Sequence, residues 1–213
     1  MTRRLGPLSG AVSVVLILAS FAAAGTAPKP DAPTSEVVSF YADHDTGQLV
    51  SACVLSLGAL LFLVFIAILS RSLRHEGVPW ILCLSGGIVF VVGLTLFAGL
   101  TIALGDVASD IDASALQALH VLNQEMFFTV TIGAAGFLLG AGAAVLGGAP
   151  LPRWLGWAAV VIGIVAAVPS HVLGGVLDHI GFGGVLGLAA WSLVVSVLLT
   201  LRPPATPSES EPG

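Results

Sequence analysis

The sequence predicts an all-α fold: a polytopic membrane helix bundle with six transmembrane helices and an N-in/C-in topology. Three observations predict it. The 213 residues are 56% hydrophobic and only 9% charged, whereas a soluble globular domain carries about 25% charged residues. The mean hydropathy is +1.04. Long apolar runs recur along the chain, with arginines in alternate gaps between them. A surface this poor in charge must face lipid rather than water.

Six apolar runs are each long enough to cross a hydrocarbon core of about 30 Å, which takes about 20 helical residues. In lipid such runs must be helical, because every backbone N–H and C=O has to be satisfied within its own segment. They predict a six-helix transmembrane domain over residues 1–202, with helices at about 5–25, 49–70, 78–105, 120–147, 154–177 and 180–201. Residues 203–213 are rich in Pro and Ser, which predicts a disordered cytoplasmic tail.

The first run has a second interpretation. Arg3 and Arg4, an apolar stretch and the sequence Ala22-Ala23-Ala24 are also typical of a cleaved signal peptide. The run is long enough to span, so we predict that it is retained as the first helix. Cleavage would leave five helices with the same orientation.

The arginines orient the predicted bundle. If the N-terminus is cytoplasmic, Lys29 is the only Lys or Arg outside, and every arginine is on the cytoplasmic side. The arginines are Arg3, Arg4, Arg71, Arg74, Arg153 and Arg202. Trp80 and Trp154 then lie at the cytoplasmic interface, where indole rings are common. Most acidic residues fall on the outer side and give it a negative field: Asp31, Glu36, Asp43, Asp45, Asp106, Asp110, Asp112 and Asp178.

Glycines with a four-residue spacing occur as Gly136 and Gly140 in the fourth helix and as Gly183 and Gly187 in the sixth. Small residues one turn apart let helix backbones approach closely. This spacing suits a homo- or hetero-oligomer formed through glycine-rich faces, and it suits close packing inside one bundle better still. The lipid bilayer is the predicted partner. Nucleic acid is not, because no basic patch with interleaved aromatics occurs.

The most informative polar segment runs from Ser114 to Glu125. Ser114 and Gln117 have capping-box spacing, which predicts that a helix starts here and continues into the fourth span. His120, Asn123 and Gln124 then share one face, with Leu116, Leu119 and Leu122 away from it. An ionisable group such as Glu125 near the outer membrane boundary is a functional candidate. The alternative is a polar face that simply meets headgroups and water.

Short links between the last three helices place their outer ends close together. We therefore predict that any functional polar site is an outer cluster of His120, Asn123, Glu125, His171, Asp178 and His179. A carboxylate beside an imidazole stabilises the charged form of each. The alternative is that these groups point separately into water.

No recognisable catalytic or cofactor signature accompanies this cluster. Its His and acidic residues could bind a divalent metal, but their spacing matches no ligand motif. Walker, Rossmann, HExxH and CxxC patterns are absent, as is the G-x-S-G of intramembrane serine proteases. Cys53 and Cys83 lie in apolar runs and are expected to be buried rather than disulfide-bonded. We therefore predict no catalytic residues, no metal and no cofactor.

Several short segments form a combined pattern: 37–44, 62–65 with Arg71 and Arg74, 85–87, 118–123 and 151–157. Together they resemble a broad group of six-helix integral membrane proteins of unknown function from high-GC Gram-positive bacteria. The resemblance implies a multi-pass protein of the bacterial plasma membrane. It implies no activity.

Three function classes stay open. The first is a non-enzymatic protein of the plasma membrane, acting as an envelope or complex component. The second is a small transporter or permease, and the third is a membrane enzyme with an outer His and acidic site. The helix centres offer only residues such as Thr95 and Thr131, which disfavours transport of ions and leaves apolar or weakly polar solutes. The first class is preferred.

Overall fold

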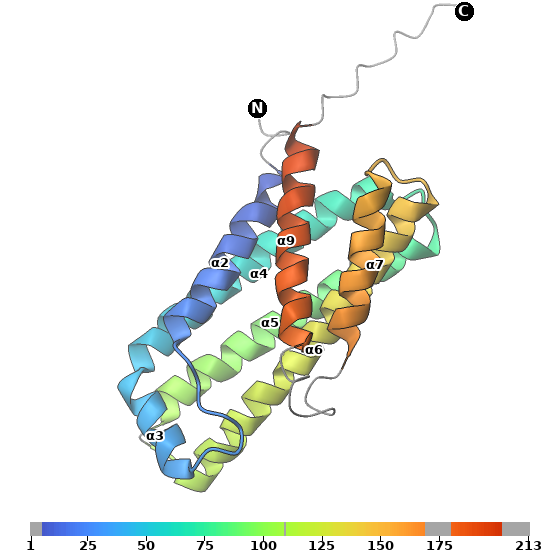
Figure 1. Ribbon diagram of the computed structural model, residues 1–213. Helices are drawn as coiled ribbons and strands as arrows, with labels where there is room; N and C mark the ends of the chain where they lie inside the picture. Colours follow the sequence, from blue (N-terminus) through green and yellow to red (C-terminus); the bar gives the residue numbers. More distant parts are fainter. Residues whose placement is uncertain (1–5, 109, 169–179, 202–213) are drawn as a thin grey trace, which may run out of the picture.

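A computed structural model describes residues 6–108, 110–168 and 180–201, with the side chains of 107 and 180–182 left out. These residues form seven α-helices and no strand (Figure 1). The helices are α2 (Leu8–Ala24), α3 (Thr34–Asp43), α4 (Asp45–Leu73), α5 (Val78–Val107), α6 (Ala113–Gly147), α7 (Arg153–Ala167) and α9 (Ile180–Leu201). The all-α prediction is confirmed for this part of the chain.

Six of the helices form a closed ring in chain order. Each packs on the next, from α2 through α4, α5, α6, α7 and α9, and α9 returns to pack on α2 (Figure 1). The connections from α4 to α5 and from α6 to α7 are short, so these neighbours are antiparallel. α5 and α6 share the most extensive contact.

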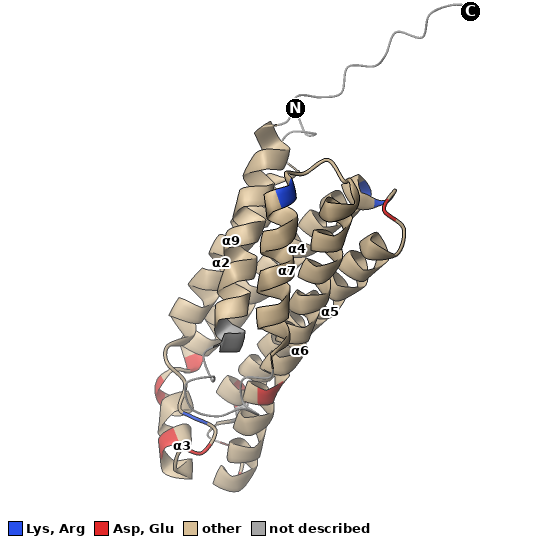
Figure 2. Ribbon diagram, turned by 45° about the vertical axis from the view of Figure 1, so that its right-hand side comes forward, with Lys and Arg blue, Asp and Glu red and all other residues tan. Residues whose placement is uncertain are grey.

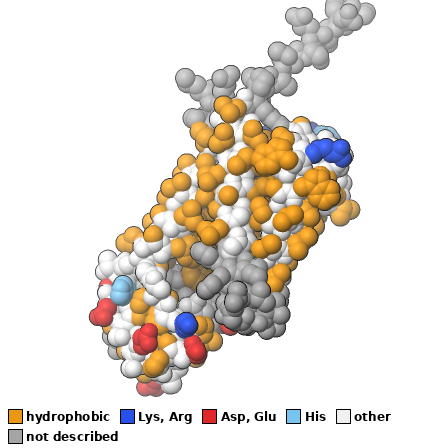
Figure 3. All heavy atoms as spheres, viewed as in Figure 1, with side chains coloured by type: hydrophobic (Ala, Val, Ile, Leu, Met, Phe, Trp, Pro, Cys, Tyr) orange, Lys and Arg blue, Asp and Glu red, His pale blue; other side chains and the backbone are white. Residues whose placement is uncertain are grey.

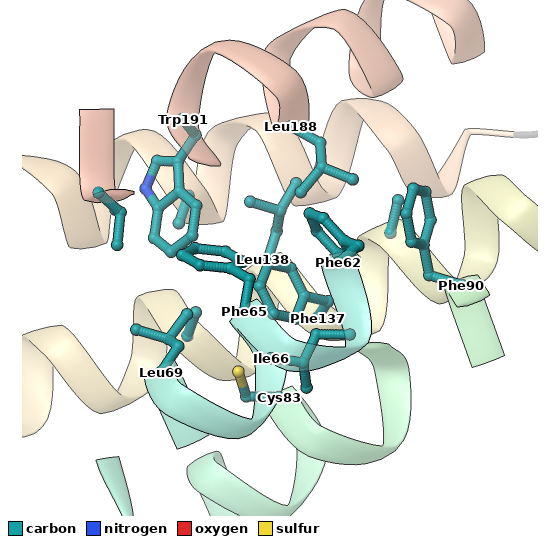
Figure 4. Packing of buried hydrophobic residues seen from close by; sticks show 14 of the residues in the cluster. Phe62, Phe65, Ile66, Leu69, Cys83, Phe90, Phe137, Leu138, Leu188 and Trp191 are labelled. Carbon is teal, nitrogen blue, oxygen red and sulfur yellow. The ribbon is translucent and has the colours of Figure 1, made fainter. Parts of the chain in front are cut away.

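Aromatic side chains fill the middle of the ring. Phe62 lies 5.0 Å from Phe90 and 5.6 Å from Phe137 between ring centroids, and Phe137 meets Trp191 edge-on at 5.9 Å (Figure 4). Tilted and edge-on pairs of this kind are the favoured aromatic geometries. The indole N–H of Trp191 donates to the carbonyl of Leu155 at 3.0 Å, so its one polar atom is satisfied.

Glycines bring α5 and α6 into direct backbone contact. A Cβ on Gly133 would collide with the backbone of Phe90, and one on Gly140 with the backbone of Cys83. Gly187 of α9 is likewise covered by Ile162 of α7, whereas Gly183 has open space beside it. Most of the predicted small-residue faces are therefore occupied inside the chain, and the oligomer that they could also support stays a prediction.

Four helical segments are long and apolar enough to cross a membrane: α4, α5 up to Asp106, α6, and Gly183–Leu201 of α9. α2 and α7 are apolar but shorter, at 17 and 15 residues. The predicted fifth span ran to residue 177. Here α7 ends at Ala167, and residues 169–179 lie outside the described part, as does the predicted tail at 203–213. Apolar side chains cover much of the face of the ring that Figure 3 shows.

Charged residues gather at the two ends of the bundle (Figure 2). One end, called here the arginine end, carries Arg71, Arg74 and Arg153, together with Glu76. The other, called the α3 end, carries Lys29 and most of the described acidic residues. Arg3, Arg4 and Arg202 lie outside the described residues.

The α3 end extends beyond the ring. α6 has 35 residues and is about 50 Å long, well over the hydrocarbon thickness of about 30 Å. α2 ends at Ala24, because Gly25 adopts a positive φ of 75° that turns the chain away. Residues 25–33, the strap, then lead into α3. The strap, α3 and the adjoining ends of α4, α5 and α6 form a cap (Figure 1).

The cap has a small core of its own. Its buried members come from α3, from the end of α5 and the residue after it, and from the start of α6: Val37, Tyr41, Leu104, Ala108 and Leu116. α3 is a ten-residue helix that lies between the first two predicted spans, where no helix was predicted. It begins after Pro33 and has Glu36 in its first turn, where the helix dipole favours a negative charge.

Candidate functional site

The strap has backbone carbonyls that need hydrogen-bond donors from elsewhere. Pro28, Pro30 and Pro33 have no backbone N–H, so the strap can make few bonds within itself. One internal bond forms, from the N–H of Ala32 to the carbonyl of Lys29 at 3.0 Å. The carbonyls of Pro28, Pro30 and Ala32 are bonded instead by side chains of α6.

Two side chains on one face of α6 supply these donors. Nε2 of His120 lies 3.2 Å from the carbonyl oxygen of Pro28. The amide of Gln117 donates to the carbonyls of Pro30 at 3.1 Å and Ala32 at 3.4 Å. The first turns of α6 therefore hold the strap by side-chain-to-backbone bonds, which fixes the entry into α3.

His120 also bonds α3, and the two bonds together define its protonation pattern. The hydroxyl of Tyr41 lies 2.9 Å from Nδ1 of His120, and neither side chain is more than 2% exposed. A carbonyl can only accept, so Nε2 must carry the hydrogen that Pro28 receives. In the neutral ring Nδ1 is then an acceptor, and the Tyr41 hydroxyl donates to it.

Asn123 completes the group, which we name the polar node: Tyr41, His120 and Asn123. Burial raises the pKa of Tyr41 to about 12, while a hydrogen bond from Asn123 acts in the opposite direction. The phenol therefore keeps its proton at physiological pH and remains a donor to His120. Asn123 is 5% exposed, and its Oδ1 has no partner among the described residues.

The structure brings together only part of the predicted outer cluster. His120 and Asn123 are neighbours in the polar node. Glu125 is exposed and lies away from them on the surface of α6. His171, Asp178 and His179 lie outside the described residues, so a shared site of all six residues stays a prediction.

Two predictions about the segment from Ser114 to Glu125 have different outcomes. The prediction that it is helical and runs into the next span is confirmed, because α6 is continuous from Ala113 to Gly147. The prediction that Leu116 lies away from the face of His120 is wrong. Both residues are fully buried, one turn apart, because the strap and α3 cover the face expected to meet headgroups and water.

Tyr41 and the strap carbonyls were not predicted as parts of the site. Tyr41 is the only tyrosine of the chain and lies 79 residues from His120. A usable signal was present in the three closely spaced prolines, which leave carbonyls without local donors and so call for donors from another element.

The chemistry of the polar node is that of a clamp. Both nitrogens of His120 and the hydroxyl of Tyr41 are engaged within the chain. Among residues 6–108, 110–168 and 180–201, no three His, Cys, Asp or Glu side chains come together as a metal ion would require. The arrangement joins three elements that are distant in sequence: the strap, α3 and α6.

Fold and site together define a class of protein. A ring of apolar helices around an aromatic core, with a polar cap at one end, is a membrane-embedded helical bundle. Comparisons of the chain with models of protein families, with curated proteins and with solved structures give no match.

Proposed function

We propose that this chain is a six-helix, multi-pass protein of the plasma membrane, with both termini cytoplasmic and the cap outside. We propose further that its role is non-enzymatic, as an envelope or complex component that presents the cap. One observation carries the role. The most highly organised polar side chains, His120 and Tyr41, turn inward and bind the chain's own strap and α3.

Two features support six spans and this orientation. α2 and α7 are full members of the ring and pack alongside the four longer helical segments, so they lie at the same depth. Arg71, Arg74 and Arg153 share one end of the bundle, as expected for a cytoplasmic face.

The filled centre supports a role other than transport through the bundle. Phe62, Phe65, Phe90, Phe137 and Trp191 pack against one another across the ring (Figure 4). A permeation path along the axis would need polar groups at mid-depth, and here the axis is occupied by rings.

Cysteine labelling in intact cells tests the orientation. In a Cys53→Ser, Cys83→Ser background, a cysteine at Lys29 or Glu36 is expected to react with a membrane-impermeant maleimide. A cysteine at Arg74 or Arg153 should react only after permeabilisation. All four positions are exposed side chains, which makes them matched reporters. Labelling of Arg74→Cys in intact cells would overturn the orientation.

Photo-crosslinking in the same cells tests the role. A crosslinking residue at Glu36 on the cap should yield a discrete protein adduct. The same residue at Leu60, on the apolar outer face of α4, serves as the control and should yield none. If no cap position gives an adduct that the control lacks, the proposed role as a complex component fails.

A further inference from the structure

α7 presents a stripe of large exposed side chains on its outward face. The stripe begins with Arg153, the first residue of the helix, and continues at every third or fourth position, which keeps its members on one side. Trp157, Val161 and Ile164 are each more than half exposed. From Arg153 to Ile164 the stripe is about 16 Å long, at a rise of about 1.5 Å per residue. That length matches one leaflet, which is half of a hydrocarbon core of about 30 Å.

The polar groups at the start of this stripe are all hydrogen-bond donors. The guanidinium of Arg153 carries five N–H groups and each indole carries one, and none of these side chains is an acceptor. Trp154 is more than half exposed and lies one turn from Trp157. Within the described part of the chain, Arg153 has no carboxylate partner and neither indole N–H is bonded. This end of the stripe therefore selects a group that is rich in acceptors and negatively charged.

The other described arginines lack this combination. Arg71 is exposed and also leads into an apolar face, but it lies in the last turn of α4, where free backbone carbonyls disfavour an anion. Arg74 follows that helix, and its Nε donates to the ring of the adjacent His75 at 3.3 Å. No tryptophan lies within α4. Arg71 is therefore a matched control for Arg153, because it has the same charge and exposure at the same end of the bundle.

We propose that the outward face of α7 binds a phospholipid with a net negative headgroup. Its phosphate oxygens accept hydrogen bonds from Arg153 and the two indoles, and one acyl chain lies along Val161 and Ile164. The charge of Arg153 selects an anionic lipid over a zwitterionic one, whose own cation already neutralises its phosphate. The apolar part of the stripe selects a lipid over a free phosphate ion, which would gain nothing from it. The inference rests on the membrane-spanning position proposed for α7, and not on the orientation or role of the protein.

Photolabelling of the full-length protein in nanodiscs tests the proposal. The nanodiscs consist mostly of phosphatidylcholine, with a minor share of phosphatidylglycerol. A trace of one of these two lipids carries a diazirine in the middle of an acyl chain. The phosphatidylglycerol probe should label peptides of α7 several-fold more than the phosphatidylcholine probe. Added inorganic phosphate should not compete, whereas high salt should lower the ratio of the two probes by screening Arg153.

Substitutions at the two exposed arginines locate the preference. Arg153→Gln removes the charge and keeps a polar side chain, so it should bring the ratio of the two probes on α7 close to one. Arg153→Lys keeps the charge and should retain part of the preference. Arg71→Gln, the matched control, should leave the ratio on α7 unchanged. Thermal unfolding checks that each variant is folded, and the wild-type protein in high salt gives the same comparison without any substitution.

Three results would each overturn the proposal: equal labelling of α7 by the two probes in the wild-type protein, an unchanged ratio in Arg153→Gln, or an equal fall of the ratio in Arg71→Gln. If neither probe labels α7 while both label the other helices, the membrane-spanning position of α7 is contradicted as well. Failure of the lipid preference can therefore be told apart from failure of the proposed six-helix arrangement.

Discussion

The hydrogen bond between Tyr41 and His120 can be abolished by removing a single heavy atom, the hydroxyl oxygen of Tyr41. Tyr41→Phe keeps the ring in the cap core but leaves Nδ1 of His120 buried without a donor. Loss of such a partner costs about 1–3 kcal/mol. We therefore expect the variant to be less stable by about that amount, measured as the free energy of unfolding in detergent.

Ser39→Ala is the matched control for this experiment. It also removes one hydroxyl from α3, but Ser39 is exposed and bonds only its own helix, at the carbonyl of Glu36. Surface changes of this kind usually stay within about 0.5 kcal/mol. If the two variants unfold at the same denaturant concentration, the polar node is not the clamp described above.

Of the three residues of the polar node, His120 and Asn123 could be predicted from the sequence, and Tyr41 could not. His120 and Asn123 stand out because they are polar residues on one face of a helix that leads into an apolar span. Tyr41 belongs to a separate element 79 residues away. A single sequence does not show which polar face of a helix will be covered by a segment that is distant in the chain.

Among the helix pairs, the contact between α5 and α6 tolerates added side-chain volume least. Gly133→Ala would place a methyl group against the backbone of Phe90, which cannot move aside as a side chain end can. Overpacking of this kind costs about 1–3 kcal/mol, so the variant should unfold earlier in a denaturant titration in detergent. Gly99→Ala is the control: it lies on α5 with nothing within 4 Å and should be neutral or slightly stabilising. An equal loss of stability in both variants would show that the destabilisation of Gly133→Ala is not steric.

The long helices were predictable because each corresponds to an apolar run, and a run of that length has few alternatives in a membrane. Their ends were predictable only in part. α6 begins at Ala113, next to the helix start predicted at Ser114, whereas α4 begins at Asp45, before the apolar residues that marked its predicted start. α3 was missed because its ten residues mix Ser and Glu with Val and Tyr. Its apolar side is stabilised by packing on α5 and α6 rather than by lipid.

For the whole molecule, the structure favours retention of the first helix. The hydroxyl of Ser13 on α2 donates to the carbonyl of Gly58 on α4 at 2.7 Å, and Ile17 belongs to the central core. Loss of α2 would expose this part of α4. We expect the intact mass of the protein purified from membranes to include residues 1–24. A mass that lacks them, from a protein that is still folded, would contradict this and favour the signal-peptide interpretation.

The contact of α2 with α9 also sets an order for biogenesis. α2 is synthesised before α9, because synthesis runs from the N-terminus. Until α9 has been made, the flank of α2 around Gly10 lacks the neighbour that covers it in the folded ring, so it must be solvated by acyl chains or held by the insertion machinery. The ring can therefore close only once α9 has joined α2.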